Sequence, residues 1–175
     1  MAEESKDKQI RVLIIGTGHQ IQRHQDTQPE REKRRAEFEE CLRQIIKERK
    51  IELIAEEAGD DAAVWEKLSQ EDELVGEFAD AFGIGSKTVD KPVPTIAKNI
   101  ADEHPGVVRH VDIRAPNAEE LTVEQRDDAM AAKITDVLKT AESAVVIVGE
   151  DHREGVSQRL KAAGLSVESL SFPAV

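Results

Sequence analysis

The chain contains few aromatic residues and an excess of negative charge. Only 3% of its 175 residues are aromatic, and tyrosine is absent. Proteins that bind nucleic acid need positive charge for the phosphates, and often aromatic side chains on which bases stack. Here 36 acidic residues outnumber 24 basic ones, which gives a formal net charge of −12. This composition argues against binding to nucleic acid or to an anionic membrane surface.

Long apolar segments and paired cysteines are also missing. No stretch approaches the roughly 18 apolar residues of a membrane span, and residues 1–8 hold no signal-peptide core. The single cysteine, Cys41, cannot form an internal disulfide and falls on the apolar stripe of a predicted helix. A buried structural thiol is therefore favoured over a nucleophile. Together these features predict a cytoplasmic protein with one domain over residues 1–175 and a flexible segment over residues 1–9.

Short apolar runs alternate with helical patterns along the chain. The runs cover residues 10–15, 51–55, 107–113, 144–148 and 165–172, and the helical patterns cover residues 30–50, 61–82, 95–103, 122–141 and 154–164. This alternation is typical of βαβ units, whose right-handed crossovers place helices on both faces of a parallel sheet. The sequence predicts an α/β fold, a three-layer αβα sandwich with a mostly parallel four- or five-stranded sheet. The last run is expected at a sheet edge, and the helix over residues 30–50 could pair in a homo-oligomer.

Polar residues follow the predicted strands at their carboxyl ends. The four clusters are Gly16-Thr-Gly18-His19, Glu56-Glu57, Asp112, and Gly149-Glu-Asp-His152. Ligands of open parallel sheets bind outside these strand ends, and glycine lets the chain turn there and approach a ligand closely. We therefore predict one shared site. Its catalytic candidates are His19, His152 and Glu56 or Glu57, and its ligand-binding candidates are Gly16, Gly18, Asp112 and Gly149.

An arginine on a predicted helix adds to this site. Arg126 lies one turn before Met130 and shares the apolar face of Met130 and Ile134. A helix that follows a strand begins at the carboxyl edge, so Arg126 is expected to face inward there. A buried charge needs a partner, and Glu56, Glu57, Asp112 or an anionic group of a ligand could supply it. In contrast, His110 lies inside a predicted strand and is expected to be structural.

The order of these motifs resembles the group that includes the TraB and Tiki proteins, the erythromycin esterases and the ChaN-like proteins. That group has two Gly-x-x-His motifs at strand ends, a Glu after the second strand and, in TraB-like members, an Arg-centred motif that opens a helix. The matching positions are Gly16 to His19, Glu56, Arg126 to Met130, and Gly149 to His152. Asp127 stands where TraB-like members tend to carry Asn. The resemblance implies a shared site, and members are associated with peptide cleavage or pheromone inactivation, ester hydrolysis, and haem or iron binding.

These observations predict a hydrolase that acts on a small ester or peptide-like ligand. In one version His19, His152 and Glu56 bind a divalent metal such as Mn, Co or Zn, because two imidazoles and a carboxylate with an open position for water form a catalytic metal set. In the other version one histidine is a general base oriented by the glutamate, and Arg126 stabilises developing negative charge. The alternative is a non-catalytic protein that binds a small ligand, haem or a metal at the same edge.

Overall fold

The computed structural model describes residues 11–18, 21–22, 29–58 and 94–172. Five strands form one sheet in the order β3-β2-β4-β1-β5, and every pair in it is parallel. The strands are β1 (Arg11–Thr17), β2 (Leu53–Glu56), β3 (Arg109–Asp112), β4 (Ser143–Gly149) and β5 (Ser166–Ser171). The predicted α/β fold with a parallel sheet is confirmed, and β5 lies at an edge as expected.

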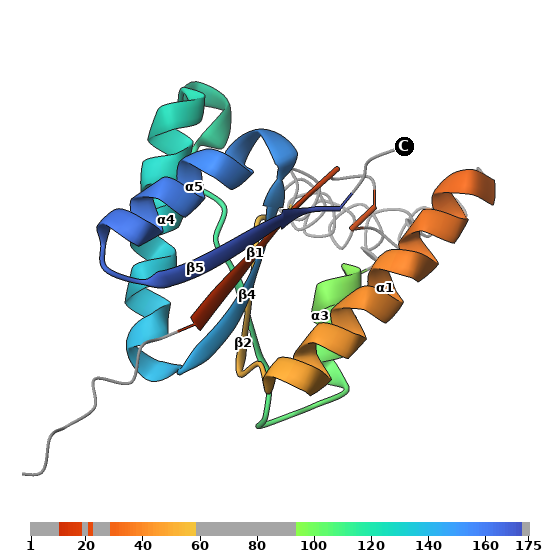
Figure 1. The fold of residues 1–175 in the computed structure, drawn as a ribbon. Helices are drawn as coiled ribbons and strands as arrows, with labels where there is room; N and C mark the ends of the chain where they lie inside the picture. The colour runs from red at the N-terminus through yellow and green to blue at the C-terminus, as the bar shows by residue number, and fades with distance from the viewer. Residues whose placement is uncertain (1–10, 19–20, 23–28, 59–93, 173–175) are drawn as a thin grey trace, which may run out of the picture.

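Helices cover both faces of the sheet (Figure 1). On one face lie α1 (Pro29–Arg49) and α3 (Ile96–Asp102), and on the other lie α4 (Val123–Val137) and α5 (Glu150–Ala162). The strand order explains this division. From β1 through β2 to β3 the chain moves toward one edge, and from β3 through β4 to β5 it moves back. Because right-handed crossovers in opposite directions place their helices on opposite faces, the two pairs of helices are separated by the sheet.

Local sequence signals agree with the helix boundaries. Pro29 is the first residue of α1, where a missing N–H costs nothing, and Phe38, Leu42 and Ile46 form its buried stripe. The predicted capping box of α4 is present, since the Thr122 side chain accepts from the Gln125 backbone and the Gln125 side chain accepts from the Thr122 N–H. These caps fix where the helices start relative to the strand ends.

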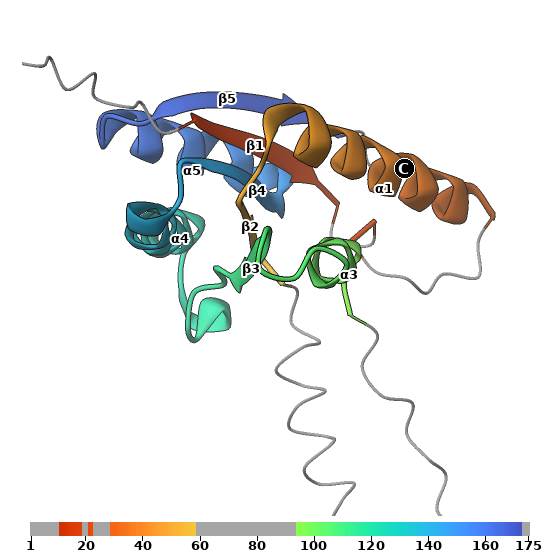
Figure 2. The ribbon, with the colours of Figure 1, turned by 90° about the horizontal axis from the view of Figure 1, so that it is seen from below.

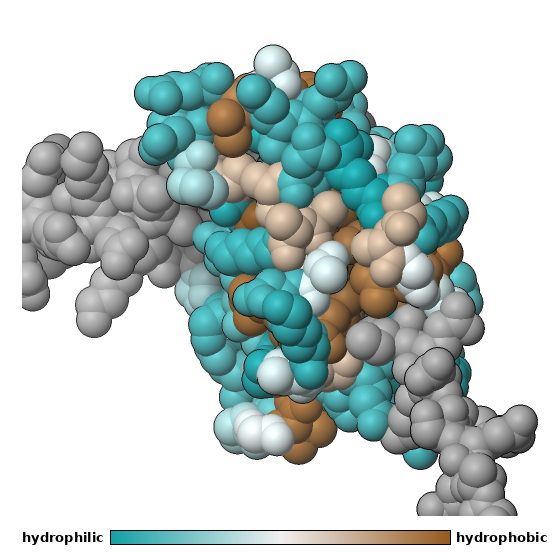
Figure 3. All heavy atoms as spheres, turned by 90° about the vertical axis from the view of Figure 1, so that its left-hand side faces the viewer, coloured by the Kyte–Doolittle hydropathy of each residue, from teal (hydrophilic) through white to brown (hydrophobic). Residues whose placement is uncertain are grey.

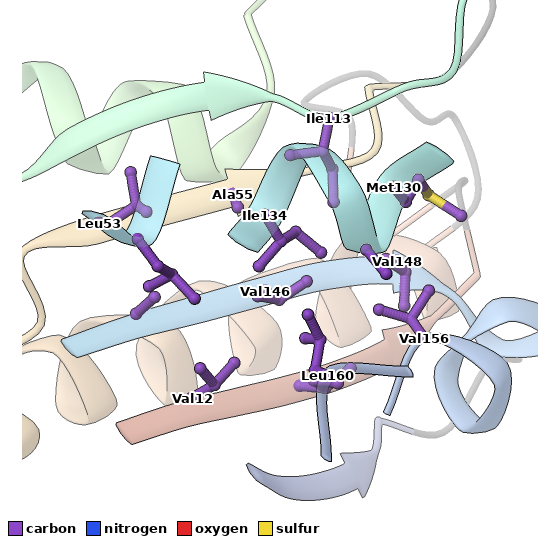
Figure 4. Close-up of a cluster of buried hydrophobic side chains, with 14 of the residues drawn as sticks. Val12, Leu53, Ala55, Ile113, Met130, Ile134, Val146, Val148, Val156 and Leu160 are labelled. Atoms are coloured by element: carbon purple, nitrogen blue, oxygen red, sulfur yellow. The ribbon is translucent and has the colours of Figure 1, made fainter. Parts of the chain in front are cut away.

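Alternate residues of each strand pack on opposite faces of the sheet. In β2, Leu53 and Ala55 join the cluster under α4 and α5, which Figure 4 shows, whereas Ile54 joins the cluster under α1 and α3. Extending this period of two past the last apolar residue sends Glu56 to the α1/α3 face and Glu57 to the α4/α5 face. Two adjacent glutamates therefore belong to different sides of the sheet (Figure 2 shows these sides edge-on).

The outer side over α4 and α5 is covered mostly by hydrophilic side chains, with smaller apolar areas between them (Figure 3). In the described part of the chain no helix has the length and apolar character needed to cross a membrane. Cys41 on α1 is partly rather than fully buried, and this burial raises the pKa of its thiol. The predicted helix over residues 61–82 and the segment 1–9 lie outside the described residues.

Candidate functional site

The strand order creates a switch point between β1 and β4. These strands are neighbours, and Thr17 at the end of β1 pairs with Gly149 at the end of β4. After β1 the chain leads to α1 on one face, and after β4 it enters α5 directly on the other face. Diverging connections open a crevice at the carboxyl ends, which is where ligands of such sheets bind. Gly149 is the N-cap of α5, and His152 lies in the first turn of that helix.

The His152 ring is held by an aspartate from α4. Its Nδ1 lies 2.6 Å from Asp127 Oδ1, and both residues are buried, with 3% and 4% of their surface exposed. A carboxylate only accepts hydrogen bonds when ionised, so a neutral His152 carries its proton on Nδ1 and donates it to Asp127. The lone pair is then on Nε2. This arrangement fixes both the tautomer and the orientation of the ring.

The second nitrogen of His152 faces a glutamate from the end of β2. Glu57 Oε1 lies 3.7 Å from His152 Nε2, and the other oxygen, Oε2, accepts a 3.1 Å hydrogen bond from the Gly149 N–H. The first distance is too long for a direct hydrogen bond, but a water molecule can hydrogen-bond to both atoms. Glu57, Asp127 and His152 thus form one buried polar group, which we call the His152 cluster.

Close packing of α4 against α5 supports the His152 cluster. Arg159 of α5 places Nη1 3.7 Å from Asp127 Oδ2, donates to the Gly155 carbonyl oxygen and pairs with Asp128, whose hydrogen bond raises the pKa of the guanidinium. A Cβ atom on Gly155 would lie only 1.9 Å from Asp127 Oδ2. An alanine at position 155 would therefore force Asp127 to move.

The neighbouring glutamate, Glu56, has different partners. Its Oε2 accepts a 2.6 Å hydrogen bond from the Thr95 hydroxyl and lies 2.9 Å from His110 Nε2, and Glu56 is 0% exposed. All three residues lie on the α1/α3 side. The structure thus brings Glu57, and not Glu56, to His152. Of the predicted metal set, Glu56 and His152 bind partners on opposite faces of the sheet, and His19 lies outside the described residues.

Several predicted site residues have local roles. Asp112 accepts from the Arg114 N–H at 2.9 Å and so organises its own turn. Gly16 lets α5 approach β1, since a Cβ there would lie 2.2 Å from Glu150 Oε2. The carbonyl of Gly18 accepts from the Ile21 N–H in a turn. His19 lies outside the described residues.

Arg126 is half-buried in the first turn of α4, as its position on the apolar face suggested. Its Nε is buried and has no hydrogen-bond partner in the described part of the chain. The expected ion pair with Glu56, Glu57 or Asp112 does not form among the residues that the structure describes.

Asp127 is the residue that sequence analysis missed as a functional candidate. A signal was present, because Asp127, Met130, Ala131 and Ile134 are all buried and follow the spacing i, i+3, i+4 and i+7. An acidic residue on the buried stripe of a helix needs a buried partner. His152 is that partner.

A metal centre is not formed by the described residues. Nowhere in residues 11–18, 21–22, 29–58 and 94–172 do three or more His, Cys, Asp or Glu side chains take an arrangement that could hold a metal ion. Within the His152 cluster, Nδ1 of His152 is hydrogen-bonded to Asp127, so the atoms of the described residues that could face an ion there are Nε2 and Glu57 Oε1.

Comparison of the chain with protein-family models, with curated proteins and with solved structures finds no match.

Proposed function

We propose that this protein is a hydrolase of small ester or peptide-like substrates, with His152 as its general base. The observation that supports this most is the buried 2.6 Å contact between His152 Nδ1 and Asp127 Oδ1. A carboxylate that holds the far nitrogen of a histidine is the arrangement by which many hydrolases orient a base and stabilise its protonated form. The resemblance to the erythromycin esterase and TraB group is in keeping with this reaction class.

In the proposed reaction, Nε2 of His152 takes a proton from a water molecule that attacks the substrate carbonyl carbon. Glu57 Oε1, 3.7 Å from Nε2, accepts the second hydrogen of that water and so orients its oxygen. Asp127 stabilises the imidazolium that results. When the tetrahedral intermediate collapses, Nε2 returns the proton to the leaving oxygen or nitrogen. Arg126, whose Nε has no hydrogen-bond partner among the described residues, supplies positive charge for the oxyanion.

The test is hydrolysis of a panel of small esters and peptides by the purified full chain. Once a substrate is found, His152→Ala and Asp127→Asn should each lower kcat/KM by about 10²–10⁴-fold, the range for loss of general acid–base catalysis. The matched control is His104→Ala, because His104 is exposed and follows the C-terminal end of α3, away from the carboxyl edge. The control should retain activity. Full activity in His152→Ala would contradict the proposal.

A second measurement distinguishes a metal-dependent reaction from the proposed metal-free mechanism. Under the proposed mechanism, dialysis against a chelator leaves the activity unchanged, and added Mn, Co or Zn does not raise it. If activity disappears on chelation and returns with one of these ions, His152 acts as a metal ligand and not as a free general base. Saturable haem binding with no turnover of any panel member would instead favour the non-catalytic alternative.

A further inference from the structure

Arg159 of α5 is anchored beside the His152 cluster by acceptors from two helices. Its Nη1 donates to the Gly155 carbonyl oxygen at 3.0 Å, and its Nη2 donates to the Glu124 carbonyl oxygen at 3.3 Å. Its Nε donates to the Asp128 carboxylate. These acceptors belong to α4 and α5, which lie on one face of the sheet (Figure 1). Because the guanidinium is planar and its donors point in fixed directions, these three bonds fix its position.

The fixed guanidinium faces the oxygen of Asp127 that His152 does not use. Oδ2 of Asp127 lies 3.7 Å from Arg159 Nη1, whereas Oδ1 lies 2.6 Å from His152 Nδ1. A distance of 3.7 Å is too long for a hydrogen bond, so Arg159 acts on Asp127 through its charge. Only 5% of the Asp127 side chain is exposed, and water therefore screens this interaction less than it screens an ion pair at the surface.

A second proton on the pair of Asp127 and His152 would occupy Nε2 of the ring. With one proton, on Nδ1, the pair carries one negative charge, and with two protons it is neutral. The ring is then either an imidazolium facing a carboxylate or a neutral ring facing a protonated Asp127, and in both forms Nε2 cannot act as a base. The carboxylate of Glu57, 3.7 Å from Nε2, favours the second proton, and the cation of Arg159 opposes it.

We propose that Arg159 is a positioning residue, which acts through Asp127 to keep Nε2 of His152 free of a proton and available as a base near neutral pH. The importance of this role for catalysis rests on the proposed hydrolase function, whereas the effect on the ring does not. A charge within about 4–6 Å changes the proton affinity of such a group by about tenfold or more. Because Arg159 is partly exposed and Asp128 offsets part of its charge, we expect the low end of this range, about tenfold.

The test follows the ring nitrogens of His152 by ¹⁵N NMR while the pH of the labelled full chain is varied. The ¹⁵N shift of Nε2 reports its protonation directly, and no substrate is needed. In Arg159→Gln the midpoint should move to higher pH by about one unit, which is the tenfold change in proton affinity. The matched control is Arg153→Gln, which should keep the parent midpoint. Arg153 lies on the same helix, pairs with Glu150, and has a side chain that is 26% exposed against 28% for Arg159.

A further variant, Asp128→Asn, distinguishes the charge of Arg159 from its packing. Like Arg159→Gln, it breaks the ion pair between α4 and α5, but it removes a negative charge instead of a positive one. The midpoint should therefore stay or move to lower pH, whereas a purely structural role of Arg159 predicts the same change in both variants. Arg159→Met keeps the apolar stem of the side chain and covers the case in which Arg159→Gln does not fold. It should raise the midpoint like Arg159→Gln.

The outcomes separate this proposal from the proposed function. An unchanged or lowered midpoint in the folded Arg159 variants, or an equal rise in Asp128→Asn, overturns the role of Arg159 whether or not the protein hydrolyses any substrate. The expected rise without turnover of any ester or peptide supports the effect on the ring and contradicts only the hydrolase. With a substrate, the acidic limb of kcat/KM against pH should shift with the NMR midpoint in Arg159→Gln, and the alkaline plateau should be kept. A loss that is equal at every pH would overturn the catalytic role of Arg159.

Discussion

Replacement of Gly155 by alanine tests the contact between α4 and α5 most directly. An ordinary glycine-to-alanine change inside a helix stabilises the helix by about 1 kcal/mol. Here the new Cβ would lie 1.9 Å from Asp127 Oδ2 and 2.8 Å from Asp127 Cγ. Real contacts of a Cβ are longer than 3.0 Å, so the carboxylate must move by more than 1 Å. Its hydrogen bond to His152 is 2.6 Å long and does not survive a shift of that size unless the ring follows.

The expected cost follows from these terms. Loss of a hydrogen bond to a charged group costs about 1.5–3 kcal/mol, and overpacking of a buried site costs about 1–3 kcal/mol. After the gain in helix propensity is subtracted, Gly155→Ala should lower the free energy of unfolding by about 1.5–5 kcal/mol. Urea denaturation of the variant and the parent chain, with a check that the m-value is unchanged, measures this difference.

A double-mutant cycle isolates the cause. In an Asp127→Ala background the clash is absent, so the same Gly155→Ala change should become neutral or stabilising by up to about 1 kcal/mol. A change of sign between the two backgrounds is the specific result expected. If Gly155→Ala stabilises the parent chain, or destabilises both backgrounds equally, Asp127 does not pack against Gly155 as described.

Three further outcomes are expected. Gly16→Ala should cost about 1–2 kcal/mol, because the new Cβ would meet the ends of two side chains, Glu150 Oε2 at 2.2 Å and Arg153 Cδ at 2.7 Å, and Arg153 Cβ at 3.0 Å. Glu150 is exposed and can move aside, so this cost should be below that of Gly155→Ala, and an equal loss in both variants would argue against this. Phe38→Ala, at a fully buried position, should lower the free energy of unfolding by about 3–5 kcal/mol in urea denaturation, and a loss below about 1 kcal/mol would place Phe38 outside the core. The hydrogen bond from Arg43 lowers the pKa of Glu103, so NMR titration should show that pKa rising to its ordinary value in Arg43→Gln. A lowered carboxyl pKa stabilises the fold at pH values above the ordinary pKa, and this stabilisation is lost as the pH falls through the lowered pKa. Any difference in Tm between the parent chain and Arg43→Gln should therefore appear at neutral pH and vanish at strongly acidic pH.

The layers of the fold could be predicted because they follow from local patterns. Pure apolar runs such as Ala144 to Val148 mark strands covered on both sides, and the spacing of Phe38, Leu42 and Ile46 marks one buried helix face. The number of strands and their order in space are different matters. They depend on which strand ends are neighbours, and no local pattern contains that information.

For the candidate site, too, local patterns predicted some features, and the tertiary structure decided the others. Glycines and charged residues at the strand ends predicted that the chemistry lies at the carboxyl edge, and they included His152 and Glu57 among the candidates. They could not rank Glu57 above Glu56, since both faces of β2 are apolar and either glutamate could have faced α5. Asp127 escaped notice because its partner is 25 residues away in the sequence.

By itself, the sequence determined the kind of fold, the helix caps and the edge of the sheet where polar groups gather, because each of these depends on residues close together in the chain. Only the tertiary structure decided that Asp127 and Glu57 flank His152 and that Glu56 turns away to Thr95. The physical reason is the alternation of side chains along a strand combined with the direction of each crossover. Together these decide on which side of the sheet each of these strand-end residues lies, and they depend on the order of the strands in space.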